Sequence, residues 1–593
     1  MNVNSVTGKK WILKEFNLDE IDYIKDNFSL DEIIAKLLVI KKIKRNEIKN
    51  YLEPKIKNIL PNPNVIQDIE KASKRLIEGI KNKEKIGIFG DYDVDGACST
   101  ALLANFFSLI NINYEIHIPD RQKEGYGPSE DGFQKLIDKE VDLIITVDCG
   151  TSSFKPIEFA NNHKKDVIII DHHQSEINLP EAYSIVNPNR LDDKSNLNYL
   201  CASGVCFMFL ISVCSQLKKE NWFKKNNFQE PNLINYLDLV SLGTICDVVP
   251  LVGLNRAIVK QGLKIIKQGK NLGLKTLIDI CNITVDPTTY HVGYILGPRI
   301  NAGGRVGKCD YAANLLQNAN PKNAFRIANE LNLYNKERQI IENNLLKKIQ
   351  SQKIDNKDPL IILYGDNWHE GVIGIIASKI KDKYNKPTII ISLKEKLGKA
   401  SARSIVGFDI GSLIVSAMQS NLLLKGGGHK MAGGFSIEKS KIDDFKKFAI
   451  KRFKTQNEKI STEQKLLIDS IISPSAVNLE FYNKINYLSP FGSGNTETKF
   501  TIENLRLINS KIVGEKHIKS NLIGSDGSCI KSISFNSVDS NIAAYLLKKG
   551  NKAFNIAGKL SLNEWKGKKN VEFIIDDISV NKTHENVVPS SIG

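Results

Sequence analysis

The chain has 593 residues, which at about 150 residues per domain corresponds to roughly four domains or fewer. Hydrophobic residues make up 41% and charged residues 25%, a balance that excludes a wholly disordered, collagen-like or small disulfide-stabilised protein. The formal net charge of +16 favours a polyanionic partner such as nucleic acid, although a lysine-rich proteome gives the same surplus.

Cysteine usage and hydrophobicity indicate a cytoplasmic protein. The nine cysteines include no C-x-x-C pair, which fits buried thiols in a reducing compartment. The first 16 residues contain no apolar signal segment. The apolar stretch at 201–217 is short for a membrane span and contains three serines, so we interpret it as a buried helix and expect no membrane association.

In chain order, residues 1–80 form a lysine-rich segment that we expect to be helical. Short β-branched strands then alternate with amphipathic stretches, a pattern typical of a parallel sheet covered by helices, in a domain spanning 81–320. The expected strands are at 85–89, 114–118, 143–147 and 167–170. Polar residues follow each of them, at the edge where open α/β sheets bind ligands.

The second half of the chain contains three further expected parts. A connecting helix at 321–352 leads into a smaller α/β domain at 353–458. The last part, 459–593, has alternating short strands typical of a small all-β barrel. Within these parts we expect strands at 360–364 and 388–392 around a helix at 371–384, and a hairpin of 554–562 with 570–575.

The strongest chemical signal is the sequence GDYDVDG at positions 90–96, which carries Asp91, Asp93 and Asp95. In an extended chain, alternate side chains project to one side. Three unpaired carboxylates so close would raise one another's pKa, so a bound cation is the simplest explanation. An EF-hand loop begins in the same way, but its twelfth position needs a glutamate and here is Leu102. From this segment alone, a solvated acidic turn is the alternative.

Other expected strand ends supply further metal ligands. Asp148 lies in VDCG, His172 and His173 follow an aspartate in DHH, and Asp247 lies in CDVVPL. A single aspartate is usually a helix cap and a single histidine a core residue, but together these form an oxygen-rich set with imidazoles. Such a set suits Mn²⁺, with Mg²⁺ or Zn²⁺ as alternatives. Carboxylates around two divalent cations roughly 3.5–4 Å apart are typical of phosphoryl hydrolysis.

These motifs resemble the DHH phosphoesterase superfamily, and further segments resemble its RecJ family of bacterial single-strand-specific 5′→3′ DNA exonucleases. The resemblance runs from about residue 40 to residue 580 and keeps the order of the family's motifs. The matching segments are IPDRQKEGYG (118–127), GPRINAGGRVG (297–307), HEGVIGIIASKI (369–380), GGGHKMAGGFS (426–436) and LSPFGSGN (488–495).

The resemblance implies a DHH parallel-sheet domain, a smaller DHHA1 α/β domain joined to it by a long helix, and a C-terminal OB-like domain. It also implies two divalent cations, Mn²⁺ first and Mg²⁺ second. One would be held by Asp95, Asp148, His172 and Asp247, and the other by Asp93, the shared Asp148 and, as a further candidate, Asp91. Because adjacent residues of an extended chain face opposite ways, we expect His173 to contact the scissile phosphate or act as an acid.

The resemblance also implies residues that hold the nucleic acid. Ser401 and Arg403 lie in ASARS, where the RecJ pattern usually has glycines at the two alanine positions. With Arg121, they match positions that bind a terminal 5′-phosphate. The remaining expected contacts are Arg299, Asn301 and Arg305 near the cleft, and the glycine-rich Gly427, Gly428 and His429. Candidates for base stacking in the barrel are Phe535, Trp565 and Phe573, flanked by Lys566, Lys568 and Lys569.

The implied function is a two-metal, single-stranded-DNA-specific 5′→3′ exonuclease of DNA repair and recombination. We expect a monomer that binds single-stranded DNA and works with a single-strand-binding protein and a helicase. One alternative is a DHH-family oligoribonuclease or cyclic-dinucleotide phosphodiesterase, although such relatives are generally shorter and lack the OB-like end. The other is a non-catalytic single-strand-binding module, although relatives of that kind have lost metal ligands that are all present here.

Overall fold

The structure is a computed structural model, which describes residues 3–121, 123–317, 320–352, 358–456, 464–548, 553–565 and 567–580. The chain divides into two compact units. Unit 1 comprises residues 1–60, 248–261 and 463–593, and unit 2 comprises residues 61–247 and 262–462. No helix in the described ranges is long and apolar enough to cross a membrane.

Unit 2 begins with a five-stranded sheet in which every pairing is parallel, in the order β4-β3-β5-β6-β7. The four strands expected from the sequence are present within one residue of their expected ends, and β7 is additional. The strands are β3 (Ile86–Gly90), β4 (Tyr114–His117), β5 (Leu143–Val147), β6 (Asp166–Ile170) and β7 (Ser184–Val186). The sheet is therefore the parallel sheet that the alternating pattern predicts.

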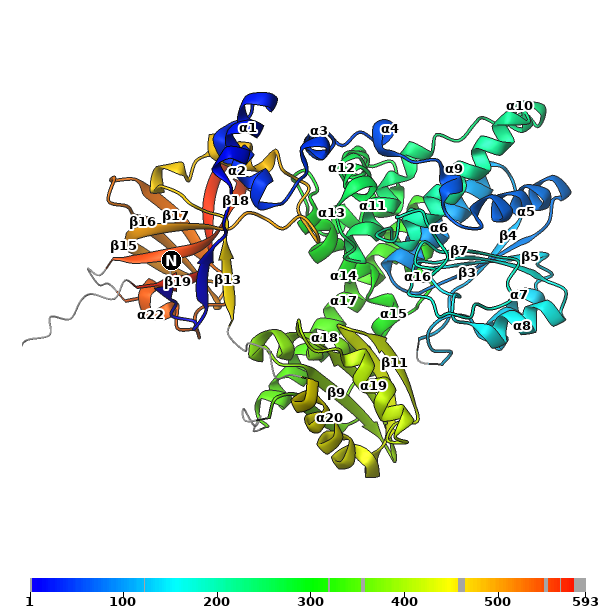
Figure 1. Cartoon of the computed structure of the whole chain (residues 1–593). Coiled ribbons are helices and arrows are strands. Elements are labelled where there is room, and N and C mark those ends of the chain that lie inside the picture. Colours follow the sequence, from blue (N-terminus) through cyan, green and yellow to red (C-terminus); the bar gives the residue numbers. More distant parts are fainter. Residues whose placement is uncertain are drawn as a thin grey trace, which may run out of the picture. The chain divides into compact units, whose positions relative to one another are not determined.

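Helices cover both faces of this sheet (Figure 1). On one face, Phe133 of α7 (Glu130–Ile137) and Ile157 of α8 (Phe154–Asn162) pack in a buried cluster with Phe89 and Ile169 of the strands. The other face contacts α6 (Val94–Leu109) and α9 (Ala202–Lys219), and α5 (Ile69–Asn82) packs on α9. The helix α9 covers the apolar stretch at 201–217 and is almost entirely buried, as expected.

A helical region follows and ends in one long helix. The helix α17 (Pro321–Gln350) starts at Asn320, whose side chain accepts a hydrogen bond from the Asn323 amide, and its 30 residues correspond to the expected connecting helix. The other helices here are α10 (Trp222–Lys225), α11 (Leu237–Cys246), α12 (Gly253–Gln268), α13 (Leu272–Ile280), α14 (Gly297–Ile300), α15 (Gly303–Val306) and α16 (Tyr311–Leu316).

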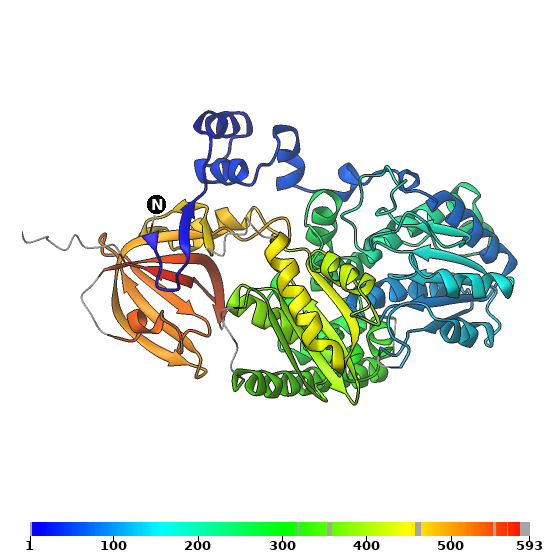
Figure 2. The same cartoon turned by 60° about the horizontal axis from the view of Figure 1, so that its bottom comes forward.

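A second five-stranded sheet, in the order β11-β12-β10-β9-β8, completes unit 2. Only the β8–β9 pairing is parallel, and this pair flanks α18 as expected. Figure 2 shows α19 and α20 lying across one face of the sheet. The elements are β8 (Ile361–Asp366), α18 (Glu370–Tyr384), β9 (Thr388–Lys394), β10 (Leu397–Arg403), α19 (Ile410–Gln419), β11 (Lys425–His429), β12 (Ala432–Glu438) and α20 (Ile442–Gln456).

Unit 1 contains a closed β-barrel, as expected for the C-terminal part. Strand pairing runs β15-β16-β17-β19-β18 and returns from β18 to β15, which closes the barrel. The expected hairpin is the longer β18–β19 pair. The elements are β13 (Lys465–Ile468), β14 (Ser470–Ile471), α21 (Leu479–Asn486), β15 (Phe500–Val513), β16 (His517–Ile523), β17 (Cys529–Ser534), α22 (Ala543–Leu546), β18 (Phe554–Trp565) and β19 (Lys568–Ser579).

The candidate stacking residues of the barrel divide into two kinds. Phe573 is fully buried in the barrel core, so it stabilises the fold and cannot stack on a base. Phe535 is 52% exposed and packs edge-on against His517. Lys566 and the side chain of Trp565 lie outside the described residues.

The N-terminal segment differs from the helical segment expected over 1–80. It begins with strands β1 (Val3–Asn4) and β2 (Lys10–Leu13), and β2 pairs in parallel with β13. The buried Trp11 indole donates a hydrogen bond to Asp577 Oδ2 at 2.9 Å. Helices follow, with α1 (Leu18–Phe28) and α2 (Glu32–Ile40) packed against the barrel core, then α3 (Ile48–Leu52) and α4 (Ile56–Ile59). The partner of β2 is more than 450 residues away, which no local pattern can reveal.

Candidate functional site

Strand register places three acids in line at the carboxyl edge of the first sheet. Gly90 of β3 pairs with Val147 of β5, and Val147 pairs with Ile170 of β6. The next residue in each strand is an aspartate, namely Asp91, Asp148 and Asp171. All three are buried, at no more than 3% exposure. The parallel register alone therefore concentrates carboxylates at one edge.

The helix α6 supplies two further acids, in a geometry different from the extended chain expected over positions 91–95. Asp93 is the N-cap of α6 and its Oδ1 accepts a hydrogen bond from the Gly96 amide at 3.0 Å. Asp95 lies in the first helical turn. The chain turns into a helix here because Asp93 caps it and because Gly96 fits against Asp91, where a Cβ atom would be 2.6 Å from the Asp91 carbonyl oxygen.

The carboxylate of Asp95 is held by the start of α9. Its Oδ2 accepts a hydrogen bond from the Ala202 amide at 2.6 Å, and its Oδ1 accepts one from the Ser203 amide at 3.0 Å. Two of the amide groups that a helix start leaves unpaired are thereby satisfied. Asp95 thus has a capping role that sequence analysis did not anticipate, besides its position 4.0 Å from His172 Nε2.

All the metal-ligand candidates from the sequence come together in one cluster. His172 Nε2 lies 3.3 Å from Asp148 Oδ1 and 3.6 Å from Asp247 Oδ2. Ligand atoms within 4.8 Å of one another form three overlapping groups: Asp91, Asp93 and Asp148; Asp95, His172 and Asp247; and Asp148, His172 and His173. Asp148 and His172 each belong to two of the groups, so both lie where neighbouring groups of ligand atoms meet.

The electrostatics of the cluster fit divalent cations. Burial, together with the charge of Asp93, raises the pKa of Asp91, and burial and four neighbouring aspartates raise the pKa of Asp148. Burial and Asp95 raise the pKa of Asp247 to about 8. Burial lowers the pKa of His172, which favours the neutral imidazole that binds metals. Within the described residues, Asp91 Oδ1 and Asp148 Oδ1 accept no hydrogen bond, so both remain available as ligands.

The backbone of Asp148 has φ of 61°, in the left-handed region that non-glycine residues rarely adopt. This conformation costs of the order of 1–3 kcal/mol and persists only where the surroundings enforce it. Here the Asp148 amide donates to the Ile170 carbonyl at 3.0 Å, which fixes the turn after β5. This backbone conformation positions the carboxylate of Asp148, which belongs to two of the ligand groups.

Asp171 orients His173, a role that sequence analysis missed although the residue is part of the DHH motif. Asp171 Oδ1 accepts hydrogen bonds from the backbone amides of both histidines, and lies 2.8 Å from His173 Nδ1. Burial opposes ionisation of Asp171, but the hydrogen bond and charge of His173 lower its pKa. Conversely, burial opposes protonation of His173, but its hydrogen bond to Asp171 raises its pKa to about 9.

Three more residues that the sequence did not single out support the two histidines. The side-chain amides of Asn187 and Asn189, which follow β7, donate to the carbonyl oxygens of His173 and His172 at 2.9 and 2.6 Å. The Tyr126 hydroxyl contacts His173 Nε2 at 3.2 Å and donates to the Asp148 carbonyl at 3.2 Å. Polar residues were expected directly after each predicted strand, which is where the two asparagines lie. They were not identified because β7, the strand that precedes them, was not predicted.

Arg121, Arg305 and Arg403 form a positively charged cluster next to the metal ligands, and Arg338, which forms an ion pair with Glu342 at 2.7 Å, also acts on Arg305. Burial and the positive charges of Arg121, Arg338 and Arg403 lower the pKa of Arg305 to about 10, while Asp93 acts in the opposite direction. Burial and Arg121 likewise lower the pKa of Arg403. The Arg121 guanidinium lies over the Tyr92 ring at 5.3 Å. Three cations that repel one another are suited to bind an anion such as a phosphate.

Ser401 and Arg403 lie on one face of β10, as expected. Arg403 Nη1 donates to Ser401 Oγ at 3.1 Å. Both side chains face Gly374 of α18, where a Cβ atom would lie 3.0 Å from each of them. Arg305 donates to the Gly371 carbonyl at the start of the same helix at 3.1 Å. The helix α18 therefore connects the two arginines.

Arg299 and Asn301, also expected to contact the nucleic acid, lie in α14 and at its C-terminal end. The Arg299 guanidinium donates to Asn332 of α17 at 2.9 Å and to the Ile295 carbonyl at 2.7 Å. Asn301 ends α14, and its amide donates to the Gly297 carbonyl. The contacts of Arg299 are therefore those of a residue that secures α14 on α17.

Gly427, Gly428 and His429 belong to β11, the exposed edge strand of the second sheet. A Cβ atom at Gly427 would meet nothing within 4 Å, so the backbone is open on that side. Partial burial and the charges of Arg403 and His173 lower the pKa of His429. His429 is thus near enough to both the arginines and the metal cluster to be influenced by their charges.

Comparisons with known proteins agree with this geometry. Three family models match: "DHH family, N-terminal domain" over residues 85–244, "DHHA1 domain" over 357–455 and "RecJ OB domain" over 468–577. The curated "Single-stranded-DNA-specific exonuclease RecJ" of Escherichia coli (strain K12) is 32% identical over 542 residues, 89% of this chain and 92% of that protein. The chain belongs to the RecJ family. It is therefore a metal-dependent exonuclease, as expected.

Solved RecJ structures extend the agreement to the fold and the metals. RecJ from Thermus thermophilus in complex with Mn²⁺ has a TM-score of 0.79 and 25% identity, covering 97% of this chain and 80% of that chain. Its complex with Mg²⁺ has a TM-score of 0.72 and 24% identity, covering 97% and 79%. The expected fold class and divalent cofactors are confirmed. The boundaries of the five expected parts and the roles of individual site residues stay predictions.

We expect Asp148→Asn to stabilise the metal-free protein and to weaken metal binding. Without metal, the substitution removes a buried charge that its neighbours repel, so the unfolding temperature in EDTA should rise by about 2–4 °C, the shift for about 1 kcal/mol in a domain of this size. Mn²⁺ affinity, measured by isothermal titration calorimetry, should fall at least about tenfold, or about 1.4 kcal/mol.

The exposed Asp131→Asn provides the matched control, since it removes the same charge from the surface of α7. It should change neither quantity. Unaltered Mn²⁺ affinity in Asp148→Asn would contradict the assignment of Asp148 as a shared ligand.

Proposed function

We propose that the chain is a single-stranded-DNA-specific exonuclease that degrades from the 5′ end with two divalent cations, in DNA repair and recombination. The observation that carries the proposal is the arginine cluster beside the metal ligands. Arg121, Arg305 and Arg403 form one positively charged group, and Asp93 is close enough to Arg305 to affect its pKa. A terminal phosphate held by the arginines would place the next phosphodiester bond at the acidic cluster.

Each chain element has a role in the proposed reaction. Asp91, Asp93, Asp95, Asp148, His172 and Asp247 would hold the cations, and Asp95 also secures the start of α9. When bound, the cations supply a water of lowered pKa and offset charge on the phosphate oxygens. Asp171 fixes the ring of His173 through Nδ1, which leaves Nε2, beside the Tyr126 hydroxyl, to donate a hydrogen bond to a phosphate oxygen.

The rest of the chain would guide the strand. The open backbone of β11 at Gly427 permits close approach of a phosphate, Gly428 allows β11 to pack closely on Ala432 and Gly433, and His429 adds a donor near Arg403. The barrel of unit 1 matches the RecJ OB domain, and such barrels bind single strands by stacking and charge. We further propose a cytoplasmic monomer that cooperates with a single-strand-binding protein and a helicase.

The polarity of degradation tests the proposal directly. A single strand protected by phosphorothioate linkages at its 3′ end should be degraded with Mn²⁺, whereas one protected at its 5′ end should persist. Mononucleotides should appear first from a 5′ label, and Asp148→Ala should release none. Degradation of the 5′-protected strand alone would show the opposite polarity, and binding without cleavage would favour a non-catalytic role.

Arg403→Ala should reduce the preference for a 5′-phosphate more than the rate of hydrolysis. Hydrogen bonds to charged groups contribute about 1.5–3 kcal/mol, so the ratio of kcat/KM on 5′-phosphorylated and 5′-hydroxyl strands should fall about 10–100-fold. The exposed Arg452→Ala on α20 controls for loss of positive charge and should keep the parent's ratio. An unchanged ratio in Arg403→Ala would remove Arg403 from the phosphate anchor.

A further inference from the structure

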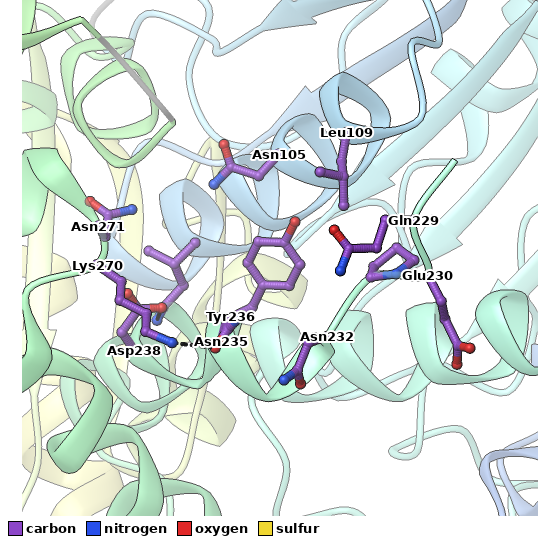
Figure 3. Close-up of a pocket in the computed structure, with 12 residues that line it drawn as sticks. Asn105, Leu109, Gln229, Glu230, Asn232, Asn235, Tyr236, Asp238, Lys270 and Asn271 are labelled. Carbon is purple, nitrogen blue, oxygen red and sulfur yellow. Dashed lines mark hydrogen bonds between the residues drawn. The ribbon is translucent and has the colours of Figure 1, made fainter. Parts of the chain in front are cut away.

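A pocket of about 320 Å³ lies in unit 2, away from the metal ligands. Figure 3 shows it between the end of α6, the start of α11 and the chain around residues 229–236 and 270–271. Its volume is within the range of small-molecule sites. The buried part is formed by Asn105, Pro231, Asp238, Leu239 and Asn271, and the exposed rim includes Leu109, Gln229, Glu230, Asn232 and Lys270.

The pocket and the metal centre lie at opposite ends of two helices, α6 and α11. The helix α6 has Asp93 at its first end and Asn105 and Leu109 at its last, and its 16 residues span about 24 Å. The helix α11 runs the other way, with Asp238 in its first turn and Asp247 directly after its last residue. A molecule in this pocket therefore cannot touch the cleavage site.

Asp238 is the chemically distinctive group of the pocket. Its side chain is 3% exposed, and Oδ1 accepts a hydrogen bond from the Leu239 amide at 2.7 Å. Among the described residues, Oδ2 has no hydrogen-bond partner. Burial raises the pKa of Asp238 to about 6, while the hydrogen bond from the Leu239 amide and the positive charge of Lys270 act in the opposite direction. Oδ2 can therefore accept hydrogen bonds from donors of a ligand in the pocket.

The walls beside Asp238 suit a flat ring. Tyr236, Pro231 and Leu239 offer apolar surfaces, and Figure 3 shows the Tyr236 ring pointing towards α6, where Asn105 and Leu109 lie. Lys270 at the rim donates to Asn235 Oδ1 at 2.8 Å, so an amine and amides are available for an acceptor group. The pocket thus combines one deep carboxylate, apolar walls and a polar rim that carries amide and amine donors together with the carboxylate of Glu230.

We propose that this pocket binds a guanine base as a second ligand site, separate from the nuclease centre. The N1–H and 2-amino groups of guanine are adjacent donors on one edge, and a carboxylate accepts from both. The O6 acceptor beside them matches the amide and amine donors of the rim. Adenine presents an acceptor at N1, which the Asp238 carboxylate repels. The same pocket therefore discriminates between the two purines.

Calorimetric titration of the full chain with guanosine tests the proposal. Guanosine carries no phosphate, so the arginine cluster contributes nothing to its binding. We expect saturable binding of guanosine that is at least tenfold tighter than that of adenosine. Asp238→Asn, which keeps an acceptor for the Leu239 amide, should weaken guanosine binding at least tenfold, and Asp148→Asn should leave it unchanged.

A second variant keeps the test valid if Asp238→Asn does not fold. Leu109 is 48% exposed at the rim, so Leu109→Trp should obstruct the pocket without disturbing the core, and should also weaken guanosine binding at least tenfold. The absence of saturable guanosine binding, equal binding of adenosine, or loss of binding in Asp148→Asn but not in Leu109→Trp would each overturn the proposal.

Discussion

Repulsion among buried carboxylates is the constraint on which the rest of the site depends. Asp91, Asp148 and Asp247 all have raised pKa values because burial and like charges oppose their ionisation. Divalent cations reverse the sign of this interaction, since each acid then faces a positive charge. Three features of the fold keep these carboxylates close together despite their repulsion: strand register, the capping of α6 by Asp93 and the left-handed backbone conformation at Asp148.

The arginine cluster is positively charged, and the same argument applies to it: buried like charges repel one another until a bound counter-charge offsets the repulsion. Arg305 and Arg403 have lowered pKa values because they are buried near other cations, and a phosphate offsets that cost. The arginine cluster combines Arg121, which follows β4 of the first sheet, with Arg305 of α15 and Arg403 of β10 in the second sheet. The helix α18 contacts both Arg305 and Arg403. A nucleic-acid backbone presents phosphates at regular intervals, so it can occupy both the arginine cluster and the cation site at once.

Much of this arrangement was predictable from the sequence, because it depends on strand ends and short motifs. The parallel sheet, the barrel and the convergence of Asp148, His172 and Asp247 follow from periodicity and motif order. Contacts between distant segments were not predictable: the capping of α9 by Asp95, the pairing of β2 with β13 and the attachment of Arg299 to α17 have no local signal. The short strand β7, with only three residues, was too weak a pattern to recognise.

The site as proposed requires that Asp148 be a ligand of two cations. Anomalous diffraction from crystals grown with Mn²⁺ tests it most directly, because the anomalous signal locates the metal without reference to the protein. We expect two peaks about 3.5–4 Å apart, one beside Asp91 and Asp93, the other beside His172 and Asp247, with Asp148 between them. A single peak, or two peaks that Asp148 does not bridge, would contradict it.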